Sequence, residues 1–105
     1  MLVYAVDMRK VTDYLLSEIH PVGRHKAVVF RALGYDSQRP SVLADDLRFL
    51  AEGGVIRSEE ANAFGVVRVV GGTLLGPSGR GRAFVTVWIL VDGGSEFRLV
   101  TAYPE

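Results

Sequence analysis

The run RAFVTVWILV at residues 82–91 consists mainly of β-branched and aromatic residues, a composition typical of a β-strand. Two further strands are predicted beside it, over Gly65–Leu75 and Glu96–Tyr103. Turn-rich segments separate the three runs: GPSGRG at residues 76–81 and DGGS at residues 92–95. The C-terminal half therefore predicts an antiparallel meander.

The N-terminal half has the spacing of helices instead. Three helices are predicted: one capped by Asp7 and carrying Val11, Tyr14 and Leu15, one over Val22–Leu33, and one from Pro40 to Gly53. A short strand is predicted before them, from Leu2 to Val6. The predicted fold class is α+β, a single domain over residues 1–105 in which N-terminal helices pack on an antiparallel sheet of three to four strands.

Composition limits the function classes. The 105 residues include 12 basic and 12 acidic side chains, so no global charge attracts nucleic acid or a membrane. The absence of cysteine excludes disulfides and thiolate chemistry and fits a cytoplasmic protein. No apolar run is long enough to span a membrane, and residues 1–5 lack the features of a signal peptide. His20 and His25, with Glu18 nearby, fit no usual metal spacing, so we expect no metal or cofactor.

Candidate functional residues gather in HPVGRHK, residues 20–26, at the start of the second predicted helix. Helical spacing places His25 and Lys26 beside a predicted buried stripe of Val22, Val29 and Leu33. Arg24 and Arg31 fall on the opposite side. A partly buried lysine needs a carboxylate or a bound anion nearby, which makes this segment a candidate binding site.

Structural roles explain the same residues. Lys26 can extend its ammonium to solvent, and His25 can bond a backbone carbonyl at the edge of the core. His20 can interact with the negative end of the first helix.

The last predicted hairpin has two unlike faces. If residues 92–95 form the turn, Thr86 lies opposite Thr101, Trp88 opposite Leu99, and Phe84 opposite Tyr103. These residues share a face that mixes aromatic rings with hydroxyls, which suits base stacking and phosphate binding, or else a second, smaller core. The other face is mainly aliphatic and is predicted to pack under the helices: Val85, Val87, Ile89, Val91, Val100 and Ala102.

The same motifs carry a family resemblance. HPVGRHKA at residues 20–27, Phe30 with Leu33-Gly34, TVW at residues 86–88 and LVTAYP at residues 99–104 resemble a family of small uncharacterised bacterial domains. The resemblance spans about Val6 to Pro104. The order of elements and the TAYP ending are also similar to the barnase-like, EndoU-like and colicin-like ribonuclease toxins.

The toxin resemblance implies metal-independent RNA cleavage by attack of the 2′-hydroxyl on the adjacent phosphate, leaving a cyclic phosphate. The implied proton-transfer residues are His25 and His20, with Tyr103 as an alternative donor or a base-stacking residue. Lys26 would stabilise the phosphate, Thr86 and Thr101 would bond its oxygens, Trp88 would contact substrate, and Arg24 and Arg31 would be peripheral contacts. The implied partners are RNA and a cognate antitoxin or immunity protein.

The rival interpretation is a non-enzymatic protein-binding module that uses the sheet face of Trp88 and Tyr103. The two hypotheses differ in geometry. An enzyme should hold His25 and Lys26 near Thr101 in a cleft, whereas a binding module should expose the aromatic face as a flat patch.

Overall fold

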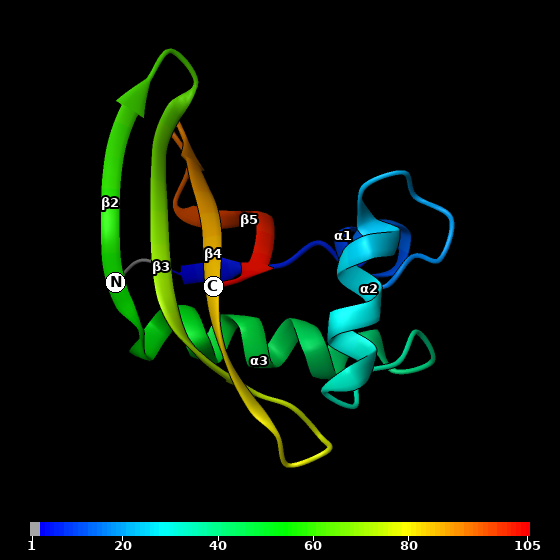
Figure 1. The fold of residues 1–105 in the computed structure, drawn as a ribbon. Helices are drawn as coiled ribbons and strands as arrows, with labels where there is room; N and C mark the ends of the chain where they lie inside the picture. The colour runs from blue at the N-terminus through cyan, green and yellow to red at the C-terminus, as the bar shows by residue number, and fades with distance from the viewer. Residues whose placement is uncertain (1–2) are drawn as a thin grey trace.

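A five-stranded mixed sheet forms the centre of the computed structural model, which describes residues 3–105 (Figure 1). The strand order is β1-β5-β4-β3-β2, with β1 parallel to β5 and the other neighbours antiparallel. In chain order the elements are β1 (Val3–Ala5), α1 (Met8–Lys10), the π-helix η1 (Val11–Leu15), α2 (Gly23–Ala32), α3 (Pro40–Gly53), β2 (Val55–Asn62), β3 (Gly65–Leu75), β4 (Gly81–Val91) and β5 (Glu96–Pro104).

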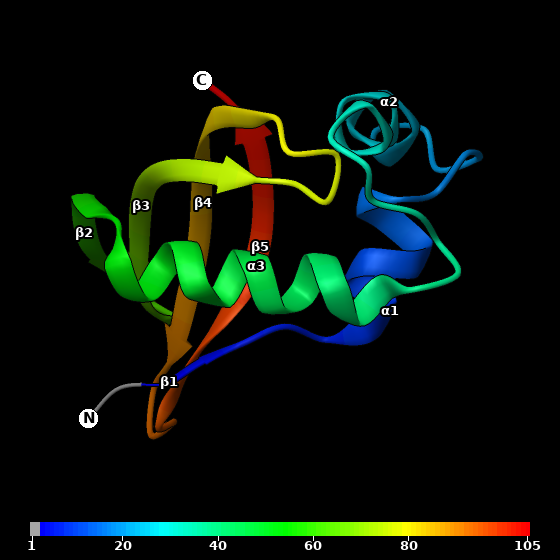
Figure 2. The same ribbon diagram turned by 90° about the horizontal axis from the view of Figure 1, so that it is seen from below.

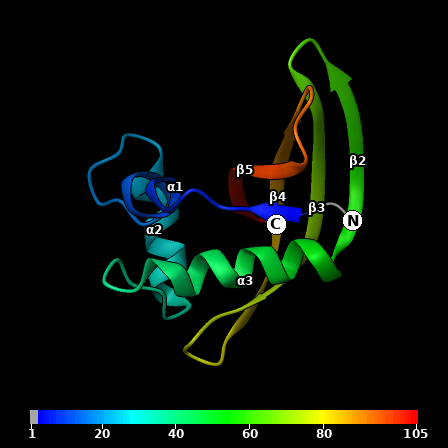
Figure 3. The ribbon, with the colours of Figure 1, turned by 180° about the vertical axis from the view of Figure 1, so that it is seen from behind.

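The helices occupy two places around the sheet. α3 lies across the strands, while α1 and α2 lie beyond the β5 side (Figure 2). Seen from behind, α3 runs from the side of α2 to the start of β2 (Figure 3). No helix within residues 3–105 has the length and apolar character needed to cross a membrane.

The α+β class is confirmed, but the sheet is larger than predicted. The polar strand β2 was missed because all eight of its residues are exposed, so it has no alternation of buried and exposed positions. β1 adds a parallel pair to the predicted meander, which makes the sheet mixed. The predicted strand Leu2–Val6 is shorter in the structure, where β1 ends at Ala5, and Leu2 lies outside the described residues.

The bounds of α2 and α3 agree with the prediction to within one residue at each end. The buried face of α2 differs, however. Leu33 is buried and Val29 partly buried as predicted, but Val22 is 53% exposed, and Gly23, Ala27 and Phe30 are also buried. Phe30 stacks on Phe84 of β4 with 5.2 Å between ring centroids, and this large aromatic contact determines which side of α2 faces the core.

The β4–β5 hairpin contains an irregularity that the sequence did not reveal. Trp88 pairs with Leu99 as predicted, but Val87 pairs with Thr101, so the register shifts at Val100. Beyond this bulge Tyr103 pairs with Val85 rather than with Phe84. Thr101 and Tyr103 therefore lie on the face opposite to Trp88.

On β4 the predicted roles of the two hairpin faces are reversed, whereas Ala102 of β5 is buried in the core as predicted. Phe84, Thr86 and Trp88 have no exposed surface and belong to the side packed against the helices. Trp88 also meets Tyr4 of β1 edge to face, with 5.0 Å between centroids. Aromatic rings bury more apolar area than valines do, and this favours the aromatic face as the core.

Candidate functional site

A groove lies between the α1–η1 segment and β5, at the point where β1 stops. β1 pairs only with Glu96–Arg98, so the rest of β5 has no strand neighbour on that side. The groove has a volume of about 720 Å³. Its lining combines carboxylates, cations, hydroxyls and one histidine: Asp7, Arg9, Lys10, Asp13, Tyr14, His20, Val100 and Thr101.

The π-helix η1 places a tyrosine against the floor of this groove. Its wide turn is closed by a bond from the Leu16 N–H to the Val11 carbonyl, 2.8 Å long. The Tyr14 hydroxyl lies 3.0 Å from Thr101 Oγ1, joining η1 to β5. π-helical turns are rare and occur frequently at functional sites.

His20 has a defined structural role in the same groove. Its Nδ1 accepts hydrogen bonds from the backbone N–H groups of Val22 and Gly23, both at 3.0 Å, and so caps the first turn of α2. A neutral imidazole whose Nδ1 accepts carries its hydrogen on Nε2. His20 therefore presents an N–H donor, and the suggested interaction with the end of the first helix is replaced by a cap on the second.

Lys26 is half-buried, as the sequence predicted, but its partner is neither a carboxylate nor an anion. Its Nζ donates to the carbonyl of Ala102 on β5 at 3.2 Å. The ammonium also lies 5.6 Å from the centroid of the Tyr103 ring and 6.0 Å from that of Tyr14. Cation–π contacts and an edge carbonyl thus hold Lys26 beside Thr101.

Among the predicted site residues, His20 and Thr101 line the groove, whereas Lys26 and Tyr103 lie beside it and are not part of its lining. His25 is exposed, and its Nε2 accepts only a long bond of 3.5 Å from Arg24 Nε. Arg31 forms an exposed ion pair with Glu18 at 3.0 Å. The structure therefore brings His20, Lys26, Thr101 and Tyr103 together at the β5 edge, without His25, Arg24 and Arg31.

Thr86 and Trp88 are buried core residues, which corrects their predicted contacts with substrate. The Thr86 hydroxyl donates to the Val70 carbonyl at 2.9 Å and accepts the Trp88 indole N–H at 2.8 Å. Both side chains are 0% exposed. Because Trp88 is buried, it also cannot contact a protein partner on the sheet face of Trp88 and Tyr103.

Thr86→Val tests this structural role. The variant leaves the buried indole N–H of Trp88 without an acceptor, so we expect the free energy of unfolding to fall by about 1–3 kcal/mol. Urea unfolding measures the loss, and any RNA cleavage by the folded fraction should not change. Thr73→Val, at an exposed position of β3, is the matched control and should leave the stability nearly unchanged.

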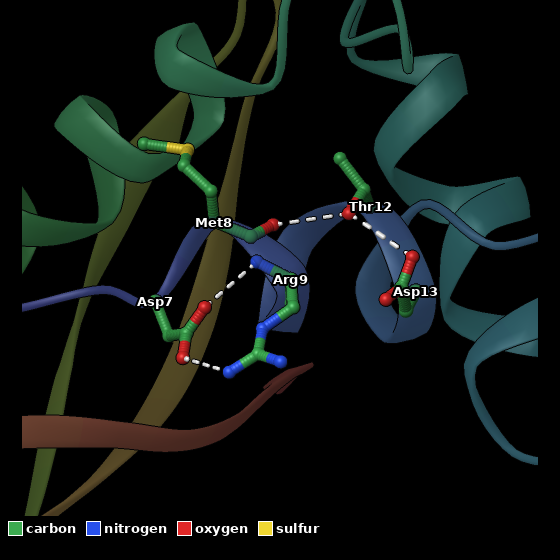
Figure 4. Close-up of polar contacts among 5 residues, drawn as sticks. All are labelled: Asp7, Met8, Arg9, Thr12 and Asp13. Atoms are coloured by element: carbon green, nitrogen blue, oxygen red, sulfur yellow. Dashed lines mark hydrogen bonds and ion pairs between the residues drawn. The ribbon is translucent and has the colours of Figure 1, made fainter.

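One ion pair lies among the groove residues, with Arg9 Nη2 3.6 Å from Asp7 Oδ2 (Figure 4). Asp7 Oδ1 accepts the Arg9 backbone N–H at 2.9 Å. This bond, together with the nearby charges of Arg9 and Lys10, lowers the pKa of Asp7, which is therefore a carboxylate at neutral pH. Asp13 accepts a bond from the Thr12 hydroxyl at 3.2 Å. Within residues 3–105 no group of three or more metal-ligating side chains is found.

Sequence reasoning missed Tyr14, Lys10 and Asp13 as groove residues. Tyr14 has the spacing of a core residue and was assigned to the apolar stripe of the first helix. The phenol of Tyr14 could have indicated a polar neighbour, because a partly buried tyrosine usually needs a hydrogen-bond partner for its hydroxyl. The partner, Thr101, is 87 positions away in the sequence.

Comparisons with known proteins place the chain by fold and family. A chain of a solved complex described as "Contact-dependent growth inhibition toxin - immunity protein complex from Klebsiella pneumoniae 342" is similar, with a TM-score of 0.76. The two share 21% sequence identity over 96% of this chain and 99% of that chain, a likeness that shows a common fold. No curated protein sequence matches the chain. The family is shown by sequence: the chain belongs to the family described as "Domain of unknown function (DUF6883)", whose model matches residues 3–105.

Proposed function

We propose that the groove beside β5 is the active site of a toxin-like, metal-independent endoribonuclease domain. In this reaction the 2′-hydroxyl of RNA attacks the adjacent phosphate, the bond to the 5′-oxygen breaks, and a cyclic phosphate remains. The observation that carries the proposal is the meeting of the His20 imidazole, the Lys10 ammonium and a hydroxyl pair in one open groove, with the Lys26 ammonium 6.0 Å from the centroid of the Tyr14 ring.

The geometry suggests separate roles for these groups. His20 is tied at Nδ1, so its Nε2–H serves as a hydrogen-bond donor to the phosphoryl oxygens rather than as a base. Lys26 adds positive charge, and Thr101 bonds a phosphate oxygen. Tyr103, with its ring beside the Lys26 ammonium, supplies a proton to the departing 5′-oxygen. Asp13, an exposed carboxylate of the groove, accepts the proton of the 2′-hydroxyl.

Two further observations support the proposal. The TAYP ending that resembles ribonuclease toxins contributes one residue, Thr101, to the lining of the groove. The fold is shared with a chain of a toxin–immunity protein complex. We therefore also propose a cognate inhibitor protein as partner, one that covers the groove. RNA contact relies on local cations, because the formal net charge is zero.

The reaction is tested with purified protein, mixed RNA and EDTA. We expect cleavage to proceed at an undiminished rate, because the groove needs no metal, and to stop when the substrate sugar at the cleavage site is 2′-deoxyribose. Activity that disappears in EDTA and returns with Mg²⁺ would contradict the proposal. So would cleavage of the deoxy-substituted strand.

A second function, protein binding without catalysis, is favoured by one observation. β2 is an edge strand paired only with β3, and all eight of its residues are exposed. Phe64, in the turn that follows, is 74% exposed. Such an edge can accept a strand from another protein. RNA that stays intact at high protein concentration would favour this function.

A further inference from the structure

Tyr14 stands at the centre of the contacts that assemble the groove. Its hydroxyl lies 3.0 Å from Thr101 Oγ1. Its ring meets His20 edge to face, with 4.9 Å between centroids and an angle of 69° between the planes. The ammonium of Lys10 lies 5.5 Å from the centroid of the same ring, and that of Lys26 lies 6.0 Å away. One side chain of η1 therefore touches groups from α1, α2, β5 and the loop before α2.

The hydroxyl pair of Tyr14 and Thr101 can donate one hydrogen bond to a ligand. Each hydroxyl has one hydrogen to donate and two lone pairs to accept. One hydrogen is used in the bond between them, whichever residue donates it. The accepting hydroxyl keeps its own hydrogen, which is free for a ligand oxygen. Two ammonium groups nearby favour a ligand with negative charge.

We propose that Tyr14 is the positioning residue of a phosphate site in this groove. Its hydroxyl fixes the direction of Thr101 Oγ1, and its ring holds Lys10 and Lys26 near the bound phosphate through cation–π attraction. The identity of the ligand as an RNA phosphodiester rests on the proposed function. The phosphate site itself requires no cleavage.

The test uses an RNA oligonucleotide with 2′-O-methyl groups, which cannot be cleaved by 2′-oxygen attack. Binding is followed by the amide NMR signals of Thr101 and η1 as the oligonucleotide is added. Tyr14→Phe removes one hydroxyl and keeps the ring. We expect the dissociation constant of the oligonucleotide to rise about tenfold or more. The reason is that Thr101 Oγ1 loses the Tyr14 hydroxyl, which directs its hydrogen bond toward the charged phosphate.

Tyr4→Phe is the matched control. The Tyr4 hydroxyl accepts a bond from Arg68 Nη1 at 2.9 Å, close in length to the Tyr14 bond, and Tyr4 does not line the groove. We expect this variant to bind like the wild type even where its melting temperature falls. Equal dissociation constants for Tyr14→Phe and the wild type would overturn the inference. Failure of the wild-type protein to bind would also overturn it.

Binding of the uncleavable RNA by Tyr14→Phe and cleavage of ordinary RNA test two separate proposals. If binding depends on Tyr14 while ordinary RNA stays intact, the phosphate site stands and the ribonuclease proposal fails. If RNA is cleaved and Tyr14→Phe has wild-type affinity and rate, the ribonuclease proposal stands and the role of Tyr14 fails. Where RNA is cleaved, a positioning role also predicts a raised KM in Tyr14→Phe when both proteins are assayed well below their melting temperatures.

Discussion

Replacing His20 with asparagine is expected to lower the rate of RNA cleavage about 10²- to 10³-fold, the usual cost of removing one donor to a developing oxyanion. The physical reason is the loss of the Nε2–H that His20 presents while its Nδ1 is occupied by α2. Asparagine retains an acceptor for the backbone N–H groups of Val22 and Gly23. The rate is measured with a defined RNA oligonucleotide, and the melting temperature is recorded alongside.

His25→Asn is the matched control for this variant. His25 is the same residue type five positions along the chain, but it is exposed and does not line the groove. We expect the His25 variant to keep nearly the full rate. If His25→Asn abolishes cleavage and His20→Asn does not, the reaction has been assigned to the wrong histidine and the groove is not its site.

Gly23→Ala is expected to lower the free energy of unfolding by about 3 kcal/mol, at the upper end of the usual cost of overpacking. A Cβ at position 23 would lie 1.8 Å from the carbonyl oxygen of Tyr14 and 2.6 Å from its carbonyl carbon. Both are backbone atoms and cannot rotate away, so α2 must move relative to η1. That movement would also disturb the His20 cap and the groove. Urea unfolding gives the stability, and RNA cleavage reports on the site.

Gly53→Ala provides the comparison for Gly23→Ala. Gly53 also lies at a helix end, but nothing is within 4 Å of a Cβ built there, and its φ is not positive. We expect this variant to match or slightly exceed the wild-type stability, because alanine favours the helix. Equal stabilities for the two alanine variants would show that the contact between η1 and α2 is not tight.

The sequence predicted those elements whose residues bury one face. α3 was found from its apolar stripe and from Pro40, and β3, β4 and β5 from their β-branched and aromatic runs. β2 was not found because pairing with β3 stabilises it without burial of its side chains. The parallel pairing of β1 with β5 joins segments about ninety positions apart, and no local pattern encodes such a contact.

The proximity of some candidate residues could be predicted from the sequence. His20, Lys26, Thr101 and Tyr103 were chosen by residue type and do lie near one another around the β5 edge. Thr86 and Trp88 were misplaced because the aromatic face of β4 packs into the core, and the bulge at Val100 puts Thr101 and Tyr103 on the opposite face. Tyr14 joined the site only through its long-range bond to Thr101.

The proposed function requires RNA to be cleaved at the groove by 2′-hydroxyl attack. The most direct measurement is the mass of the RNA fragments released in EDTA by the wild-type protein and by Thr101→Val, which keeps the side-chain shape and loses the hydroxyl. We expect fragments ending in a 2′,3′-cyclic phosphate from the wild type, and a strongly reduced yield from the variant. Intact RNA, fragments ending in a free 3′-hydroxyl, or equal yields from the two proteins would contradict it.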